Sequence, residues 1–327
     1  MKVAVTGGTG CLGKPLIKRM LMSGYDVNLL LLPQDNIDTE LNGRVKIFKG
    51  NLDSINVLTN LVDGCDAVFH LAGKVHEKTK TIEDELEFYH VNVDGTKKLI
   101  NSCINKKVKR FIFYSTVGVY GNKGNFHGDE QSLCNPESPY AKSKLQAEKI
   151  VMECMNNAGS IGVVLRFPVV YGPWDRGNVQ KLIKALEKKI FFYFGDGKNI
   201  RSMISSENAA EAAFRAANQG LDKSDVFCVT DGRDYSFKEL INEICNSLNT
   251  TWRPWHISPF SSKAIGSIGD FIKKTTGLNV PIDSETVSKL SKSLTFSCEK
   301  AERILDYKPV ENLSEGLDRE VKWIFQR

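Results

Sequence analysis

Tyr140 and Lys144 are the two side chains whose types and spacing best suit chemistry. They lie four residues apart in a segment, residues 140–157, whose pattern predicts a helix, so both fall on one face. An ammonium at that position is expected to lower the pKa of the phenol and to bind a cofactor ribose. A phenol tuned in this way exchanges a proton with an alcohol or ketone while a nicotinamide exchanges a hydride. Thr116, which ends an expected strand, is placed to hydrogen-bond the same oxygen.

The same spacing also fits a surface helix with an ordinary tyrosine and lysine. A second motif is needed to distinguish a catalytic pair from such a helix. Residues 2–5 are predicted to form a short strand, and residues 14–23 carry apolar side chains at helical spacing. Between them, Gly7 can take a backbone angle closed to other residues, Gly10 has no Cβ to keep a pyrophosphate away, and Gly13 lets the helix lie close to the strand. Free N–H groups at the helix start then face the phosphates of a dinucleotide.

Strand and helix patterns alternate along the first half of the chain. Strands that alternate with helices imply parallel pairing through right-handed crossovers. The predicted fold class is therefore α/β, with a doubly wound parallel (Rossmann) sheet and a smaller C-terminal substrate lobe. The expected strands are residues 27–32, 45–48, 67–71, 111–115 and 163–166, and the expected helices are residues 55–62, 83–106 and 140–157.

The pattern becomes less regular after Pro168. A turn is expected at residues 195–197 and a strand at 226–229, with helices at 181–189 and 207–219, whereas residues 250–295 have the least regular pattern. We expect residues 1–167 to form the dinucleotide-binding domain, with residues 204–232 returning to it. Residues 168–203 and 233–327 are then expected to form mainly the substrate-binding lobe.

Composition limits the class of protein. The chain has 327 residues, 41% of them hydrophobic and 25% charged, with a formal net charge of +5 that is spread along the sequence. This is typical of a soluble globular protein and gives no reason to expect nucleic-acid binding. No segment predicts a signal peptide or a membrane span, and the eight cysteines include no Cys-x-x-Cys pair, so we expect reduced thiols in a cytoplasmic protein. The five histidines show no metal-ligand spacing, so no metal site is expected.

With these motifs the sequence resembles the extended short-chain dehydrogenases/reductases, also called NAD-dependent epimerases and dehydratases, and within them the nucleotide-sugar 4-epimerases. The resemblance covers nearly the whole chain. Besides the glycine loop and the Tyr-x-x-x-Lys motif, it is carried by residues 51–53, 70–73, 92–96, 115–121, 165–173 and 195–202.

The resemblance implies roles for individual residues. Catalysis is assigned to Thr116, Tyr140 and Lys144. Substrate binding is assigned to Thr116, Asn178 and Arg201, with Arg201 clamping a diphosphate. Cofactor binding is assigned to Gly7, Gly10, Cys11, Leu12, Gly13, Asn51, Leu52, Asp53, Leu71, Ala72, Gly73, Asn92, Tyr140, Lys144 and Phe167.

The cofactor and the partners also follow from the resemblance. Leu31 and Leu32 stand where many NAD-using relatives have an acidic residue, and no basic residue is evident there. NAD is therefore the expected cofactor, with NADP left open. Relatives pair the helices expected at residues 83–106 and 140–157 across a dimer interface, so a homodimer is expected.

Departures from the family pattern narrow the reaction. Dehydratases carry an Asp-Glu pair after the catalytic threonine, whereas Val117 and Gly118 follow Thr116 here, and no acid–base cysteine and histidine stand beside it. A dinucleotide sensor without catalysis would normally lose Tyr140 or Lys144. Hydride chemistry on an alcohol or ketone remains.

Two activities stay open. The first is epimerisation at C4 of a nucleotide-linked sugar, with a UDP-sugar as substrate, which residues 176–178 and Arg201 favour. The second is an NAD(P)-dependent reductase or dehydrogenase of a steroid-like or flavonol-like substrate. Val169 favours the second, because many sugar-nucleotide enzymes have an asparagine at that position.

Overall fold

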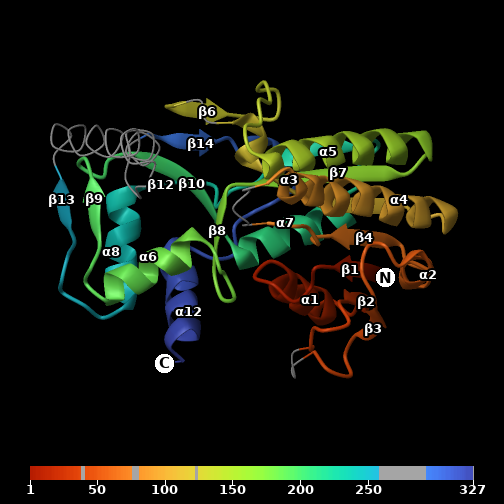
Figure 1. The fold of residues 1–327 in the computed structure, drawn as a ribbon, viewed down its shortest axis with the longest axis horizontal. Coiled ribbons are helices and arrows are strands. Elements are labelled where there is room, and N and C mark those ends of the chain that lie inside the picture. Colours follow the sequence, from red (N-terminus) through yellow and green to blue (C-terminus); the bar gives the residue numbers. More distant parts are fainter. Residues whose placement is uncertain (38–40, 76–80, 122–123, 258–291, 327) are drawn as a thin grey trace.

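The fold is built on a parallel sheet. The computed structural model describes residues 1–37, 41–75, 81–121, 124–257 and 292–326. Among these, seven strands pair in the order β11-β7-β5-β4-β1-β2-β3, all parallel (Figure 1). This confirms the predicted α/β doubly wound class. The strands are β1 (Lys2–Thr6), β2 (Asp26–Leu31), β3 (Lys46–Lys49), β4 (Ala67–His70), β5 (Arg110–Thr116), β7 (Ile161–Phe167) and β11 (Asp225–Cys228).

Helices cover both faces of this sheet (Figure 1). One face packs against α1 (Gly13–Met22), α7 (Ser206–Asn218) and α11 (Glu299–Leu305). The other face packs against α2 (Ile55–Leu61), α4 (Gly95–Asn105) and α5 (Pro139–Asn157). Because both faces are covered, the central strands are continuous apolar runs, as is typical of parallel sheets.

The single helix expected at residues 83–106 is three elements in the structure. They are α3 (Ile82–Tyr89), a π-helical turn η1 (His90–Asp94) and α4. The wider turn places the amide of Asn92 against the main chain of Lys74, where Oδ1 accepts from the N–H at 2.7 Å and Nδ2 donates to the carbonyl at 3.2 Å. A π turn of this kind often marks a functional site.

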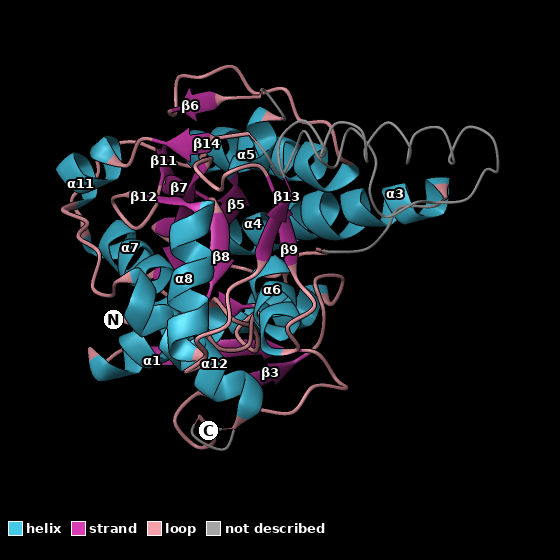
Figure 2. Cartoon of the chain, turned by 90° about the vertical axis from the view of Figure 1, so that its left-hand side faces the viewer, coloured by secondary structure: helices cyan, strands magenta, loops and turns pink. Residues whose placement is uncertain are grey.

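A second lobe is built mainly from the chain after β7. Its sheet contains β6 (Phe126–Gly128), β8 (Val169–Tyr171), β10 (Ile200–Ser205), β12 (Asp234–Ser236) and β14 (Leu294–Phe296), while β9 (Phe192–Phe194) pairs with β13 (Trp255–Ile257). Helices α6 (Asn178–Glu187), α8 (Phe237–Ser247) and α12 (Leu313–Phe325) enclose a separate apolar core (Figure 2). A short 3₁₀ helix, η2 (Val117–Tyr120), leaves the end of β5.

We propose that the domain border lies between β7 and β8, as expected from the sequence. β11 returns to the first sheet from the segment expected to do so. One difference is that Cys298, α11 and Tyr307 pack into the core of the first sheet and not into the smaller lobe. A second is that β6, which lies within residues 1–167, pairs with β14 in the second sheet. Most of the irregular segment expected at 250–295 lies outside the described residues.

A buried carboxyl group joins the lobes. Glu320 on α12 is fully buried, and its Oε2 accepts a hydrogen bond from the N–H of Gly172 at 2.8 Å. The carbonyl of Gly172 faces the thiol of Cys11 in the glycine loop, with 3.8 Å between Sγ and O. Among the described atoms Glu320 Oε1 has no partner, and burial raises the pKa of this carboxyl to about 8.

This position predicts a pH-dependent loss of stability. A carboxyl group whose pKa rises on folding stabilises the fold below its ordinary value of 4.5, and that contribution disappears as the pH rises through about 8. Glu320→Gln does not titrate. In thermal melts the variant should match the wild type at about pH 4 and exceed it by at least about 2–4 °C at about pH 9.

Glu153→Gln, the same change on the exposed side of α5, is the control and should leave the pH dependence of the melting temperature unchanged. Parallel melting curves for wild type and Glu320→Gln over this range would contradict the buried, proton-linked carboxyl.

Candidate active site

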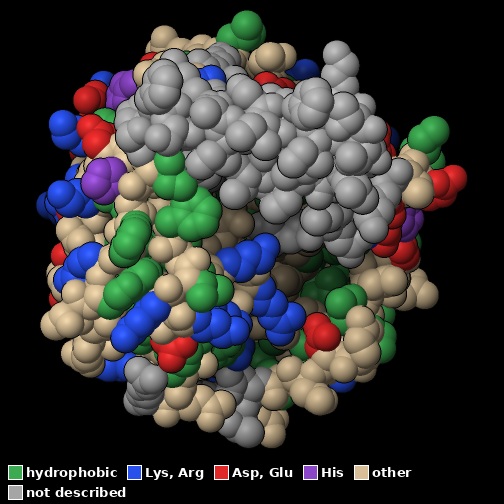
Figure 3. Space-filling view, turned by 60° about the vertical axis from the view of Figure 1, so that its left-hand side comes forward, with side chains coloured by type: hydrophobic (Ala, Val, Ile, Leu, Met, Phe, Trp, Pro, Cys, Tyr) green, Lys and Arg blue, Asp and Glu red, His purple; other side chains and the backbone are tan. Residues whose placement is uncertain are grey.

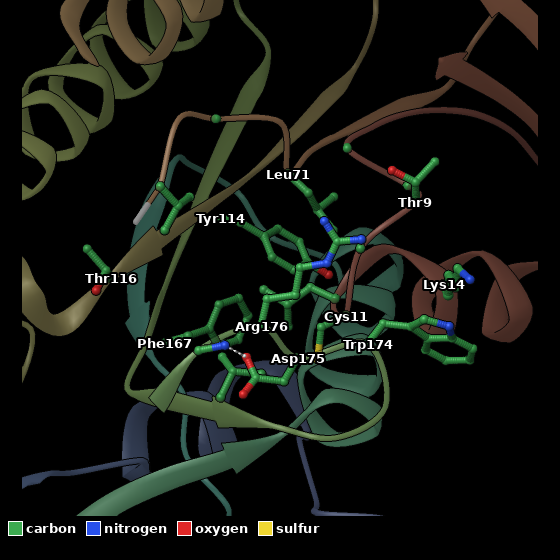
Figure 4. A pocket seen from close by; sticks show the side chains of 18 of the residues that line it. Thr9, Cys11, Lys14, Leu71, Tyr114, Thr116, Phe167, Trp174, Asp175 and Arg176 are labelled. Atoms are coloured by element: carbon green, nitrogen blue, oxygen red, sulfur yellow. Dashed lines mark hydrogen bonds between the residues drawn. The ribbon is translucent and has the colours of Figure 1, made fainter. Parts of the chain in front are cut away.

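A cavity of about 920 Å³ lies at the carboxyl ends of the central strands, between the two lobes (Figure 4). This is at the upper end of the range for ligand pockets, about 300–1,000 Å³. It lies where open α/β sheets bind their ligands. Of the residues predicted from the sequence, those that line it are Gly7, Gly10, Cys11, Leu12, Leu71, Gly73, Thr116, Tyr140, Lys144, Phe167 and Asn178.

The glycine loop forms one wall of the cavity. Gly7 has φ +75°, and a Cβ there would lie 2.5 Å from the main-chain nitrogen of Ala72. A Cβ on Gly13 would lie 2.4 Å from Gly8 Cα, so α1 begins directly against the turn. A Cβ on Gly10 meets no protein atom within 4 Å. Two glycines are therefore required by packing, whereas Gly10 keeps open the space that a ligand would use.

The start of α1 suits an anion. Leu12 at its N-cap provides no side-chain hydrogen bond, and the first turn has no acidic residue. By contrast, Ser138 caps α5 and Ser205 caps α7. The positive end of the helix dipole favours a phosphate here, while the N–H groups of Gly13 and Lys14 donate to the carbonyl of Gly10 at 3.2 Å. The loop and helix present therefore fit the pyrophosphate of a dinucleotide.

The three predicted catalytic residues line this one cavity. Thr116 ends β5, and its hydroxyl accepts a hydrogen bond from the N–H of Gly118 at 3.1 Å. Tyr140 and Lys144 come from the first turns of α5, which Ser138 caps. The Lys144 Nζ lies 4.0 Å from the centre of the Phe113 ring, an arrangement that stabilises a buried cation.

Burial changes the titration of both groups. It raises the pKa of the Tyr140 phenol to about 12 and lowers the pKa of Lys144 to about 7, against a smaller raising effect of Glu148. The net pKa of Tyr140 is therefore raised, and not lowered as its spacing from Lys144 predicts. The physical reason is that desolvation disfavours both charged forms, so the lysine is only partly a cation at neutral pH.

The floor beneath the cavity is a set of uncharged hydrogen bonds made by His70, Thr6 and Thr96, which lie behind the lining residues Leu71 and Gly7. His70 is fully buried, and burial lowers its pKa to about 3. Its Nδ1 lies 2.7 Å from Thr6 Oγ1, and its Nε2 lies 2.9 Å from Thr96 Oγ1. Since Thr96 Oγ1 donates to the carbonyl of Asn92 at 2.6 Å, it accepts from Nε2–H, and Nδ1 is the acceptor.

Other predicted residues are not among those that line the cavity in the described part of the chain. They are Gly13, Asn51, Leu52, Asp53, Ala72, Asn92 and Arg201.

Several of them have structural partners. Asn92 binds the main chain of Lys74 and donates to Ser143 Oγ at 2.9 Å. Asp53 accepts from Lys98 and His90 at 2.5 and 3.2 Å. Arg201 lies on β10, and its role toward a ligand stays a prediction.

The structure adds cavity residues that the motifs did not reveal. Asp35, Asn36 and Ile37 line one end, because the N–H of Asp35 bonds the carbonyl of Leu32 at 3.0 Å and turns the chain back toward the cleft. Lys49 Nζ fixes this turn by donating to the carbonyl of Asp35 at 3.0 Å. The residues that follow β2 are typical of a turn, and this pattern could have indicated that the cavity wall extends beyond the end of the strand.

On the side of the second lobe, Trp174, Asp175, Arg176 and Trp323 line the cavity. The guanidinium of Arg176 extends into it, toward the side that Thr9 and Leu71 line (Figure 4). Since Arg176 is always charged, an anionic ligand is favoured at this end.

Among the described residues no group of three or more His, Cys, Asp or Glu is arranged to hold a metal ion. Within the same ranges no helix is both long and apolar enough to cross a membrane.

Comparisons with known proteins agree with this geometry. The profile of the NAD dependent epimerase/dehydratase family matches residues 3–229. The chain is 28% identical over 331 residues to a UDP-glucose 4-epimerase of Vibrio cholerae, which spans 99% of this chain and 95% of that one. It is 26% identical over 329 residues to a sterol-4-alpha-carboxylate 3-dehydrogenase, decarboxylating, of Dictyostelium discoideum, spanning 97% and 98%. A UDP-glucuronic acid 4-epimerase from Bacillus cereus, solved with UDP-glucuronic acid and NAD, superposes with a TM-score of 0.79 at 25% identity, covering 100% of this chain and 99% of that one.

Gly10 and Gly220 give a matched test of whether the glycine loop binds the cofactor. Neither Gly10 nor Gly220 places a new Cβ within 4 Å of another atom, so alanine at either position should leave the melting temperature unchanged. Only Gly10→Ala puts a methyl group where the pyrophosphate approaches. We expect it to weaken NAD binding, measured by calorimetry, at least about tenfold, or 1.4 kcal/mol. Equal NAD affinity in both variants would place the dinucleotide elsewhere.

Proposed function

The chain belongs to the NAD dependent epimerase/dehydratase family, and from that premise we propose that it binds NAD and epimerises a nucleotide-linked sugar, a UDP-sugar, at C4 through a transient keto sugar. One observation carries the proposal. A single cavity is lined by the glycine loop, by Thr116, Tyr140 and Lys144, and by Arg176 and Asn178. Hydride chemistry and recognition of an anionic substrate therefore share one space.

The side chains have distinct tasks. Tyr140 takes the proton from the sugar hydroxyl and later returns it, while Thr116 donates a hydrogen bond to the same oxygen. Lys144, when protonated, favours the phenolate form of Tyr140 during this exchange. NAD supplies the acceptor for the hydride and the donor that returns it. Arg176 and Asn178 hold the diphosphate side of the substrate, because a guanidinium forms paired, charge-assisted bonds to phosphate oxygens.

The adenosine end of the cavity supports NAD over NADP. The carboxylate of Asp35 is in the cavity wall, where it would accept from ribose hydroxyls and repel a 2′-phosphate. The ammonium of Lys49, beside this turn, donates to the carbonyls of Pro33 and Asp35 at 3.3 and 3.0 Å. The acidic group that the sequence lacks at Leu31 and Leu32 is thus supplied by the following turn.

A second candidate is an NAD-dependent dehydrogenase of a steroid-like alcohol. Val169, which is 38% exposed, lines the cavity together with Val170, Trp174 and Trp323, and these apolar side chains suit an uncharged ring system. The similarity to a sterol dehydrogenase gives it independent support. A dehydrogenase exchanges its cofactor each turnover, whereas an epimerase regenerates NAD in the site.

We also propose a homodimer. Ile82 and Leu86 on α3 are 74% and 62% exposed. They lie in the segment for which the sequence predicts a dimer interface, and exposed apolar side chains of this kind often mark an interface.

The proposed reaction has a direct test. Purified protein is denatured and the released dinucleotide identified, and native protein is incubated with UDP-glucose or UDP-N-acetylglucosamine without added cofactor. We expect NAD and the C4 epimer. Tyr140→Phe should keep NAD binding and lower turnover at least about a hundredfold, since the proton-transfer group is lost.

Tyr25→Phe is the matched control, because its hydroxyl bonds Asn218 on the surface. An empty site together with net oxidation of a sterol by added NAD would replace the epimerase by the dehydrogenase. Near-normal turnover of Tyr140→Phe would remove Tyr140 from the chemistry.

Substrate recognition is tested at two arginines. Arg176→Ala should raise the Michaelis constant for the UDP-sugar at least about tenfold, because charge-assisted bonds contribute about 1.5–3 kcal/mol each. NAD affinity is measured in parallel, which shows whether the guanidinium serves substrate or cofactor. Arg201→Ala is compared directly, and Arg233→Ala, which removes an exposed ion pair with Glu239, is the control.

If Arg201→Ala raises the Michaelis constant tenfold and Arg176→Ala leaves it unchanged, the diphosphate binds at β10. Unchanged constants in both variants would discard the sugar-nucleotide substrate.

A further inference from the structure

A buried ion pair lies next to the catalytic groups. Arg166 on β7 and Glu148 on α5 are 5% and 3% exposed. The Arg166 Nη2 donates to Glu148 Oε2 at 2.6 Å, and its Nε lies 3.1 and 3.2 Å from the two carboxylate oxygens. Arg166 Nη1 donates to the hydroxyl of Tyr120 at 2.7 Å, and Ser115 Oγ donates to Glu148 Oε1.

The sequence positions of this network tie it to the site. Ser115 precedes Thr116, and Arg166 is the register partner of Ser115 across β5 and β7. Glu148 follows Lys144 by four residues on α5, so the two share a helix face. The network therefore lies directly behind the catalytic groups, although its residues other than Ser115 do not line the cavity.

The charges around Lys144 show why the pair matters. Lys144 is 4% exposed, and burial opposes its charge. The groups that face it are the phenol of Tyr140, neutral His70 on β4, the ring of Phe113 on β5 and Glu148. Of these Glu148 is the group whose charge favours the ammonium. A buried carboxylate is costly unless it is paired, and Arg166 provides a permanent cation for it.

We propose, on the basis of the function proposed above, that Glu148 is a positioning residue of the catalytic pair: clamped by Arg166 and Ser115, it favours the ammonium form of Lys144 that proton exchange at Tyr140 requires. The pair acts through Lys144 and does not touch the reacting atoms. It opposes in part the loss of charge that burial imposes on this lysine.

The test measures Lys144 itself and needs no substrate. Protein labelled with ¹⁵N-lysine is titrated by NMR, and the Lys144 signal is assigned by its loss in Lys144→Met. In Glu148→Gln the titration midpoint should move to lower pH by at least about one unit, since the neutral amide no longer favours the ammonium. Glu148→Asp, which keeps the charge, should fall between wild type and Glu148→Gln. Glu153→Gln, on the exposed side of the same helix, should match the wild type.

Activity supplies a second readout. Because the ammonium is lost earlier as the pH rises, the alkaline limb of the rate profile should shift to lower pH in Glu148→Gln by the same amount. If that variant does not fold, Glu148→Gln with Arg166→Gln removes both charges together, and the Lys144 midpoint should still fall because Glu148, and not Arg166, is the charge that acts on Lys144. An unchanged midpoint in any folded variant that lacks the carboxylate overturns the proposal. A shifted midpoint in a protein without epimerase activity would retain it and reject only the proposed function.

Discussion

The site depends on the close approach of the first helix to the first turn. Gly13 leaves no room for a side chain against Gly8, and Gly7 leaves none against the main chain of Ala72 after β4. These two contacts hold the start of α1 and the end of β4 at the edge of one cavity. The uncapped end of α1 and the residues after β4 then face the same ligand, and the carboxyl end of β5 adds Thr116 beside them.

Behind this wall, neutral hydrogen-bonded groups and paired charges lie in different places. His70, Thr6 and Thr96 connect β1, β4 and α4 by hydrogen bonds without a net charge, so the floor of the cavity needs no counter-ion. At Glu148 and Arg166 the buried charges are paired. A low-dielectric interior strengthens the influence of such a pair on its neighbours. Lys144 lies between the two regions, and its charge state therefore depends on both.

The sequence predicted what local spacing determines. The glycine loop and the Tyr140–Lys144 pair could be found because each depends on residues that are neighbours in the chain, and alternating strands and helices determine the sheet class. Asp35 was missed because a turn, and not a strand end, brings it to the cavity. The pKa of Tyr140 was misjudged because desolvation depends on everything packed around α5, which spacing does not contain. Whether Arg176 or Arg201 meets a substrate depends on how the second lobe faces the first, and only the fold places Arg176 in the cavity wall.

A contact between the two lobes also forms part of the cavity wall. Lys14 at the start of α1 lies 4.1 Å from the ring of Trp174, which packs on Trp323 of α12 with 6.2 Å between ring centres. Trp174 has φ +66°, a strained angle for a residue with a side chain, which persists only where its surroundings impose it. This stack spans the two lobes at the pyrophosphate end of the cavity. Because Lys14, Trp174 and Trp323 also line the cavity, the contact that joins the two lobes forms part of the cavity wall.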